Sequence, residues 1–368
     1  MSDSNWPLFF SQPYQARREE KGISGLLGAA TEAFRLNCHR VLGKHQMLNG
    51  VLNEIYRPEI SNPKIDLVYL DLTNNCNLRC EMCFLKQEKK GYMSKTLFES
   101  CVDQLSQMGV GTLYLYHGGE SLLHPDFKDY LKYAVYHRDH GWIQQVAWVD
   151  NGMLFNQSIS DLVVDLKVDV INFSIDGVGE VNDKIRLGSK YSVVERNLKY
   201  LINRRGDSVK PKVILSMVDY GKTEDQKMDV YRNWVPFVDQ IDLIPYIRHD
   251  KTCSACGTGR IAKPPAFCRV PFQMMVISWD GKVTGCCIDY TYKLHLGDAT
   301  RESLKQIWQG SRYQALRKTV LAKTFPAGSP CQKCEFWKIN FEPAEEDLLD
   351  GKAIMKYGYI YRIIRRKD

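Results

Sequence analysis

Residues 65–84 read Ile-Asp-Leu-Val-Tyr-Leu-Asp-Leu-Thr-Asn-Asn-Cys-Asn-Leu-Arg-Cys-Glu-Met-Cys-Phe, an apolar run that leads into three closely spaced cysteines. These cysteines, Cys76, Cys80 and Cys83, form a C-x3-C-x2-C pattern. Three thiolates from one loop can hold three irons of a 4Fe–4S cube and leave the fourth iron without a protein ligand. A zinc knuckle is the alternative, but structural zinc sites usually take four protein ligands, and no fourth candidate lies near this loop in sequence. The stretch therefore predicts a buried strand followed by an iron–sulfur cluster with one open position.

The sequence beyond this stretch alternates short apolar runs with amphipathic segments as far as about residue 246. Segment 94–108, for example, begins with Ser94 at an N-cap position and places Phe98, Cys101 and Leu105 on one helical face. Such alternation favours an α/β fold, a partial (β/α)6 TIM-like barrel, whose functional groups collect at the C-terminal ends of the strands. Cys101, on the core face, is expected to be chemically inert. The predicted strands are 65–72, 112–117, 145–149, 168–175, 212–218 and 241–247, and the other predicted helices are 125–136, 158–166, 192–203 and 224–234.

The composition is that of a soluble globular protein, with 44% hydrophobic and 25% charged residues among 368. The sequence contains no run of eighteen apolar residues and no signal-peptide pattern. Twelve cysteines without a secretory leader favour metal ligation in a reducing cytoplasm over a disulfide framework. The net charge of +7 is modest for this length and lacks the concentrated basic stripe of a nucleic-acid reader. The sequence thus predicts a cytoplasmic metalloenzyme without a membrane or nucleic-acid partner.

Changes in pattern divide the chain into four predicted parts. After residue 251 the cysteines cluster, and a strand pair is expected at 273–278 and 282–286 around an Asp280-Gly281 turn. Helices are expected at 303–308 and 313–321, and the tail from 352 is expected to form a packed strand or helix with a solvated basic end. The parts are an N-terminal helical extension (1–60), the core barrel (61–250), a smaller α+β auxiliary domain (251–340) and a C-terminal tail (341–368).

The C-x3-C-x2-C pattern after the first strand resembles the radical S-adenosylmethionine (SAM) superfamily. Met82 stands before the third cysteine, where that family usually has an aromatic or apolar residue. The resemblance implies that SAM chelates the open iron through its amino and carboxylate groups. It further implies that an electron from the cluster cleaves SAM to methionine and a 5′-deoxyadenosyl radical, which takes hydrogen from a substrate.

Other positions match motifs of that family at the ends of successive strands. Gly118-Gly119-Glu120 resembles its GGE motif, in which glycine permits close backbone approach and the carboxylate accepts from the SAM ammonium group. His117 and Ser121, on either side, differ from the commoner Gly and Pro. Asn151 resembles the Thr-Asn-Gly position, with Asp150 in place of Thr. The resemblance implies that the SAM ribose and carboxylate region faces Ser174, Asp176 and Arg186. For these three residues, helix capping or a surface ion pair is the alternative.

A second cysteine set resembles the opening part of the SPASM/twitch extension of the same superfamily, with the pattern C-x12-G-x4-C followed by C-x2-C. The predicted hairpin brings its first two cysteines together. The resemblance implies a fully ligated auxiliary 4Fe–4S cluster, and zinc held by four cysteines is the competing interpretation. The longer cysteine run for another auxiliary cluster is missing, which resembles twitch-type dehydrogenases and epimerases such as 2-deoxy-scyllo-inosamine dehydrogenase. The expected ligands are Cys268, Cys286, Cys331 and Cys334.

Cys253 and Cys256 form a further C-x2-C pair just beyond the sixth predicted strand. They are candidate catalytic residues, since a cysteine returns a hydrogen atom to the substrate radical in some radical epimerases. They could instead replace a cluster ligand, bind a metal, or be ordinary loop thiols. Cys287 could be packed or compete with Cys286 for the cluster.

The resulting hypothesis is an enzyme that oxidises or epimerises a small polar substrate, such as a sugar, cyclitol or natural-product intermediate. In the oxidation, the auxiliary cluster takes up an electron from the substrate radical. The resemblance implies an electron donor such as flavodoxin or ferredoxin. A peptide-modifying maturase, a zinc-stapled binding protein and an electron-transfer protein with two clusters are the alternatives.

Overall fold

The computed structural model describes residues 63–83, 85, 89–219, 221–246 and 267–334, together with the backbone of three strands between residues 345 and 364. The N-terminal extension predicted over 1–60 lies outside the described residues, as do Cys253 and Cys256. None of the described helices is long and apolar enough to cross a membrane.

Six parallel strands follow one another across the sheet in chain order, each separated from the next by helix. All six strands and all five helices predicted for the core barrel are present, with shifted ends. The short helix α8 was not predicted. Its sequence, Glu-Val-Asn-Asp-Lys-Ile, is too short to show a helical period. The strands are β1 (Leu67–Leu70), β2 (Val110–Tyr114), β3 (Ile143–Asp150), β4 (Val170–Ser174), β5 (Lys212–Asp219) and β6 (Gln240–Pro245), and the helices are α5 (Lys95–Met108), α6 (Phe127–Asp139), α7 (Gln157–Asp165), α8 (Glu180–Ile185), α9 (Tyr191–Arg205) and α10 (Lys227–Trp234).

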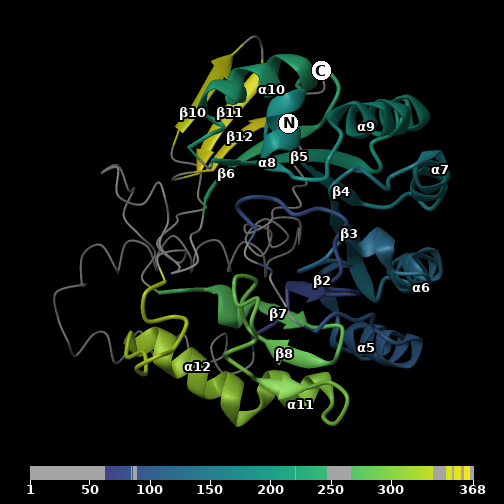
Figure 1. The fold of residues 1–368 in the computed structure, drawn as a ribbon. Coiled ribbons are helices and arrows are strands. Elements are labelled where there is room, and N and C mark those ends of the chain that lie inside the picture. The colour runs from purple at the N-terminus through teal and green to yellow at the C-terminus, as the bar shows by residue number, and fades with distance from the viewer. Residues whose placement is uncertain are drawn as a thin grey trace, which may run out of the picture.

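The C-terminal third of the chain extends this sheet at both edges (Figure 1). The strand β7 (Met274–Ile277) pairs in parallel with β1 and continues through β8 (Lys282–Thr284) to β9 (Gly297–Asp298). At the other edge, β12 pairs antiparallel with β6. The described residues thus form one open sheet of twelve strands, and the four-part division of the chain stays a prediction. The remaining elements are β10 (Glu345–Leu349), β11 (Lys352–Tyr357), β12 (Ile360–Ile364), α11 (Leu304–Gln309) and α12 (Ser311–Ala322).

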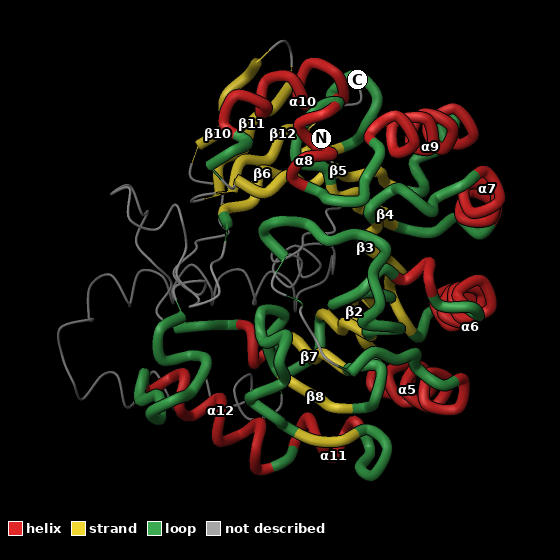
Figure 2. Tube along the Cα trace, viewed as in Figure 1, coloured by secondary structure: helices red, strands yellow, loops and turns green. Residues whose placement is uncertain are grey.

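Strand alternation decides which side chains face the helices and which face the inside of the curve. In β1, Val68 and Leu70 pack in the core cluster that contains Phe98 and Leu105 of α5. Leu67 and Tyr69 point the other way and pack with Tyr114 and residues around β7. Figure 2 shows the helices outside and the strands inside this curve. Cys101 is fully buried on the core face of α5, where the sequence placed it.

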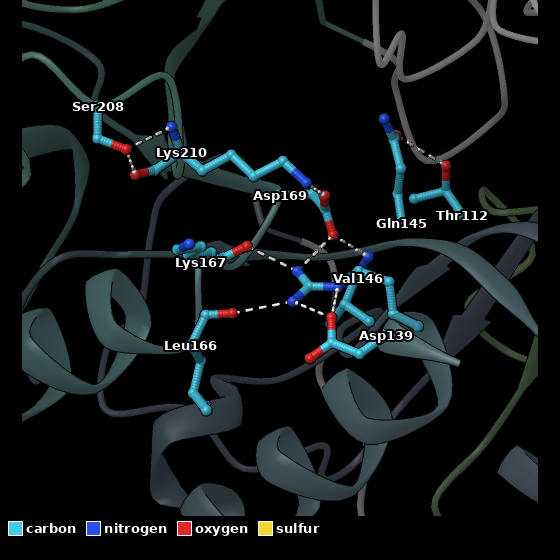
Figure 3. A network of polar contacts seen from close by, with 10 residues as sticks. Thr112, Asp139, Gln145, Val146, Leu166, Lys167, Asp169, Ser208 and Lys210 are labelled. Carbon is cyan, nitrogen blue, oxygen red and sulfur yellow. Dashed lines mark hydrogen bonds and ion pairs between the residues drawn. The ribbon is translucent and has the colours of Figure 1, made fainter. Parts of the chain in front are cut away.

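A polar network ties the N-terminal ends of β3, β4 and β5 together, at the opposite end of the strands from the cysteine loop (Figure 3). The Asp169 carboxylate accepts from Arg138 Nη1 at 2.9 Å, from Lys210 Nζ at 2.5 Å and from the Val146 backbone amide at 2.9 Å. Arg138 also donates to the Leu166 and Lys167 carbonyl groups, which lie between α7 and β4. Because Asp169 and Arg138 are almost completely buried, each depends on the other to compensate its lost hydration.

Candidate functional site

The cysteine loop begins at the C-terminal end of β1, and the turn after β2 is built against it. The Glu120 amide donates to the Asn75 carbonyl oxygen at 2.7 Å. A Cβ atom on Gly119 would overlap the carbonyl oxygens of Thr73 and Asn75, so only glycine allows this approach. Asp71, at the end of β1, accepts from the Gly118 amide at 3.1 Å. Gly119 of the GGE motif is therefore needed for this contact between the two loops, whereas a Cβ atom on Gly118 would make only ordinary van der Waals contacts.

The segment that follows α8 holds the cysteine loop from its other side. The Arg79 amide donates to the Leu187 carbonyl at 2.8 Å, and the Glu81 amide donates to the Ile185 carbonyl at 2.9 Å. Cys76 and Cys83 are exposed and Cys80 is half-buried. The backbone of the loop is thus fixed by its neighbours while its thiols remain accessible.

Glu120 carries a buried carboxylate with one oxygen unsatisfied. Its Oε2 accepts from the Asn151 amide at 3.0 Å, whereas Oε1 has no hydrogen-bond donor. Burial, followed by the negative charge of Asp150, raises the pKa of Glu120 well above its usual value. An orphaned buried carboxylate oxygen is suited to receive a cation such as an ammonium group. Asn151 also donates from Nδ2 to Asn77 Oδ1 at 2.8 Å, which connects this carboxylate to the cysteine loop.

Asp176 and Arg186 form a buried ion pair, with 2.7 Å between Asp176 Oδ2 and Arg186 Nε. Asp176 Oδ1 accepts from the Val218 amide at 2.7 Å. Arg186 Nη1 lies 3.9 Å from Cys80 Sγ, within reach of an N–H···S hydrogen bond. Ser174 is the last residue of β4 and is half-buried. The structure therefore brings Arg186, together with its partner Asp176, to the cysteine loop. Ser174 lies two residues before Asp176 in the sequence.

The residues present fit the groups that the sequence implies. Three accessible thiols in one fixed loop can ligate iron, and the unsatisfied Glu120 Oε1 can accept from a SAM ammonium group.

The four cysteines of the second set lie near one another: Cys268 precedes β7, Cys286 follows β8, and Cys331 and Cys334 follow α12. Burial raises the pKa of Cys268, and the negative charges of the neighbouring thiolates, that of Cys286 first, raise it further. Among the described residues, no three His, Cys, Asp or Glu side chains converge tightly enough to hold a single metal ion. Four neighbouring thiols are a donor set that an iron–sulfur cluster can use, and Cys268, Cys286, Cys331 and Cys334 stay the predicted ligands.

A histidine joins the two thiol sets. His117 Nε2 lies 2.9 Å from the Cys287 carbonyl oxygen, so Nε2 carries the proton and donates. Nδ1 is then the acceptor for the Tyr292 hydroxyl at 3.2 Å. The His117 ring also stacks on Tyr290, with 4.8 Å between ring centroids. His117 thereby fixes the turn that follows Cys286 against the end of β2.

Tyr290 packs on the inner side of the sheet against the same cluster as Cys268, Cys286 and Cys334 of the second thiol set. Burial raises its pKa, and Tyr116, Cys287, Cys83 and Cys286 add to the effect in that order. Cys287 is buried beside Cys286 and Tyr290, on the inner face of the sheet.

Sequence reasoning did not assign a role to several residues of this site. The signal for Asp71 was available, because it is the first polar residue after the apolar residues of β1. His117 and Asp150 were visible only as departures from a motif. The contacts of the tyrosines span more than a hundred residues of sequence and could not be read from local pattern. These residues are Asp71, Asn77, Tyr116, His117, Asp150, Tyr290 and Tyr292.

Comparison with known proteins identifies the two parts of the chain. Residues 70–232 match the radical SAM superfamily, and residues 268–335 match SPASM, an iron–sulfur cluster-binding domain. These matches imply a 4Fe–4S cluster with SAM in the first part and auxiliary iron–sulfur binding in the second.

Two curated relatives and one solved structure illustrate the similarity. The chain is 24% identical over 345 aligned residues to the tungsten-containing aldehyde ferredoxin oxidoreductase cofactor-modifying protein of Pyrococcus furiosus, covering 78% of this chain and 96% of that protein. It is 27% identical over 310 residues to the antilisterial bacteriocin subtilosin biosynthesis protein AlbA of Bacillus subtilis, covering 72% of this chain and 64% of that protein. The crystal structure of Streptococcus suis SuiB superposes with a TM-score of 0.58 at 13% identity, over 89% of this chain and 86% of SuiB, which shows the fold alone.

Proposed function

The chain is a radical SAM enzyme that carries a SPASM domain, and from this premise we propose that it takes a hydrogen atom from a small polar substrate and oxidises or epimerises it. The substrate would lie between the two thiol sets, on the inner side of the sheet. The observation that carries this proposal is the position of Tyr290, which packs on the inner side of the sheet with Cys286 and Cys334 and stacks on His117, the residue after β2 that precedes the GGE motif.

The roles of the residues follow from their positions. Cys76, Cys80 and Cys83 would hold the first cluster, and Cys268, Cys286, Cys331 and Cys334 the auxiliary cluster. Glu120 would bind the SAM ammonium group, with Gly118, Gly119 and Asn151 shaping that position. Ser174, Asp176 and Arg186 would face the rest of SAM. When bound, the first cluster and SAM supply a carbon radical that is able to take hydrogen from a substrate.

The name of one relative supports the substrate class. The Pyrococcus furiosus relative, which the chain matches over nearly its whole length, is named as a cofactor-modifying protein. That name agrees with a small-molecule substrate.

The proposal is tested by anaerobic incubation of the reconstituted enzyme with SAM, dithionite and deuterated candidate substrates. We expect SAM-derived 5′-deoxyadenosine, with deuterium transferred from the substrate position that is attacked. Mass spectrometry of the product distinguishes the two reactions. Oxidation removes two hydrogens from the substrate, whereas epimerisation in protonated solvent changes the mass only by replacing deuterium with hydrogen at the attacked position. Absence of 5′-deoxyadenosine from a fully reconstituted enzyme contradicts the proposal.

Peptide modification is a second candidate because AlbA is named for bacteriocin biosynthesis and SuiB has been crystallised with its precursor peptide SuiA. The same assay distinguishes the two. Deuterium transfer from a labelled peptide, with none from sugars or cyclitols, would replace the small-molecule proposal. If the small-molecule proposal is correct, Cys253→Ala and Cys256→Ala will show which reaction occurs: loss of product formation favours epimerisation, in which a thiol returns hydrogen.

A further inference from the structure

Arg186 makes a contact that SAM binding alone does not require. Its guanidinium is buried, pairs with Asp176 through Nε at 2.7 Å, and directs Nη1 to Cys80 Sγ at 3.9 Å. The resemblance assigns this arginine to the carboxylate of SAM. The contact with the cysteine sulfur is a separate observation about the cluster-binding thiol itself.

The surrounding backbone determines where this guanidinium lies. The residues on either side of Arg186 accept hydrogen bonds from the cysteine loop, through the Ile185 and Leu187 carbonyl groups. Asp176 is held in turn by the Val218 amide on one oxygen, and its own amide donates to Asn182 Oδ1 at 3.0 Å. Arg186 is therefore attached on both sides to the loop whose sulfur it contacts, and its fork is oriented by a fixed carboxylate.

The Arg186 guanidinium brings a positive charge and an N–H donor to within 3.9 Å of the Cys80 sulfur. A positive charge and an N–H donor beside a sulfur ligand stabilise added negative charge on the cluster, and hydrogen bonds to the sulfurs are among the factors that set cluster potentials. The contact of Arg186 with the Cys80 sulfur would thus favour the reduced cluster.

We propose that Arg186, oriented by Asp176, raises the reduction potential of the cluster bound by Cys76, Cys80 and Cys83. Arg186 is in this respect a positioning residue that acts through a cysteine ligand. The inference rests on the proposed function only in requiring a cluster at these thiols, and it does not depend on the substrate.

The test is a potentiometric titration of the full-length, anaerobically reconstituted protein in the absence of SAM, followed by electron paramagnetic resonance. The signal of the first cluster is identified in a parallel sample by its change on adding SAM. At the potential where the wild-type cluster is half reduced, we expect the ratio of reduced to oxidised cluster to be about tenfold lower in Arg186→Gln. For a one-electron couple this corresponds to a reduction potential about 59 mV lower than that of the wild type. The matched control is Arg204→Gln, an arginine of α9 that pairs with Asp161 and Asp165 and should leave the ratio unchanged.

Arg186→Lys provides the second variant, because lysine keeps the charge but cannot contact Asp176 and Cys80 through one planar fork. We expect a smaller shift in the same direction. An unchanged potential in Arg186→Gln overturns the inference, and if that variant binds no cluster, an unchanged potential in Arg186→Lys overturns it instead. If the wild-type protein binds no cluster, the proposed function and this inference fail together. A normal yield of 5′-deoxyadenosine with unchanged potentials contradicts only the inference.

Discussion

Asp150 shows how one side chain can alter a site without touching its substrate. It lies beside Glu120, both carboxyl groups are buried, and Asp150 accepts from the Gly152 amide at 2.7 Å and from Trp148 Nε1 at 3.2 Å. The donors to Asp150 favour its ionised form, whereas burial and Asp150 itself favour a proton on Glu120. The pKa of Glu120 is therefore raised in the absence of a cation, and an incoming ammonium group would favour the ionised carboxylate.

This arrangement predicts that SAM binds more tightly as the pH rises. Below the raised pKa of Glu120 the carboxyl is protonated and cannot pair with an ammonium, so the affinity for SAM should increase as the pH rises through that pKa. Asp150→Thr removes the neighbouring charge, lowers the pKa of Glu120, and should tighten binding at pH 7 while flattening the pH dependence. Calorimetric titration of the oxidised reconstituted protein with SAM measures both effects.

Glu120→Gln is the control for that experiment. It should bind SAM weakly at every pH because the acceptor charge is gone. A pH slope in Asp150→Thr as steep as that of the wild type would show that the pair does not control binding.

His117 leads to a second prediction at this scale. His117→Ala removes the donor to the Cys287 carbonyl and the acceptor of the Tyr292 hydroxyl, at a cost of about 1–3 kcal/mol for each group left unsatisfied. The turn after Cys286 should loosen, and iron per chain should fall from about eight toward about four as the auxiliary cluster is lost. Iron and sulfide analysis measures this result. His117→Gln, which keeps one donor and one acceptor, should retain most of the iron, and equal iron in all three proteins would refute the role of His117.

At the scale of the elements, the two ends of the parallel strands have different tasks. The C-terminal ends carry the thiols and carboxylates of the site. The N-terminal ends are tied together by Asp169, which contacts Arg138, Lys210 and the Val146 amide. Such a network has no accessible chemistry of its own, and its function is to hold β3, β4 and β5 in register.

The network predicts a large stability loss without a change in chemistry. Asp169→Ala leaves the buried Arg138 without its buried partner and should lower the free energy of unfolding by about 2–4 kcal/mol. Asp139→Ala removes the exposed partner of the same arginine and should cost less than about 1 kcal/mol. Urea denaturation followed by circular dichroism gives both values. Equal losses in the two variants would contradict the assignment.

At the scale of the whole molecule, the open sheet brings two cysteine sets that are almost two hundred residues apart to one region. The parallel pairing of β7 with β1 accomplishes this, because it places the hairpin that precedes Cys286 beside the strand that precedes Cys76. We expect the two sets nevertheless to bind separate clusters.

Separate sites predict separate losses. Cys286→Ala should remove about half of the iron and leave a reduced-cluster signal that still responds to SAM, whereas Cys80→Ala should remove the SAM-responsive signal and leave the other. Cys101→Ala, at a buried thiol in α5, is the control and should keep all the iron. Metal analysis with electron paramagnetic resonance distinguishes these results. Loss of both signals on replacing Cys286 alone would indicate that the two sites do not assemble independently.

The sequence by itself determined the parallel strands, the helices, the two thiol sets and the family, because these depend on local periodicity and on residues close together in the chain. It placed Ser94 at the start of α5, where its side chain accepts from the Leu97 amide, and it placed the glycines and Glu120 at the end of β2. It did not predict α8, which is too short for a period to be seen.

Only the tertiary structure decided which of these residues meet. The contact of His117 with the turn after Cys286, the approach of Arg186 to Cys80 and the position of Tyr290 each join segments more than a hundred residues apart. Such contacts depend on strand order and on the register between β1 and β7. The physical reason is that a sequence pattern specifies which face of a strand is buried, whereas the neighbour that covers that face is selected by the packing of the entire sheet.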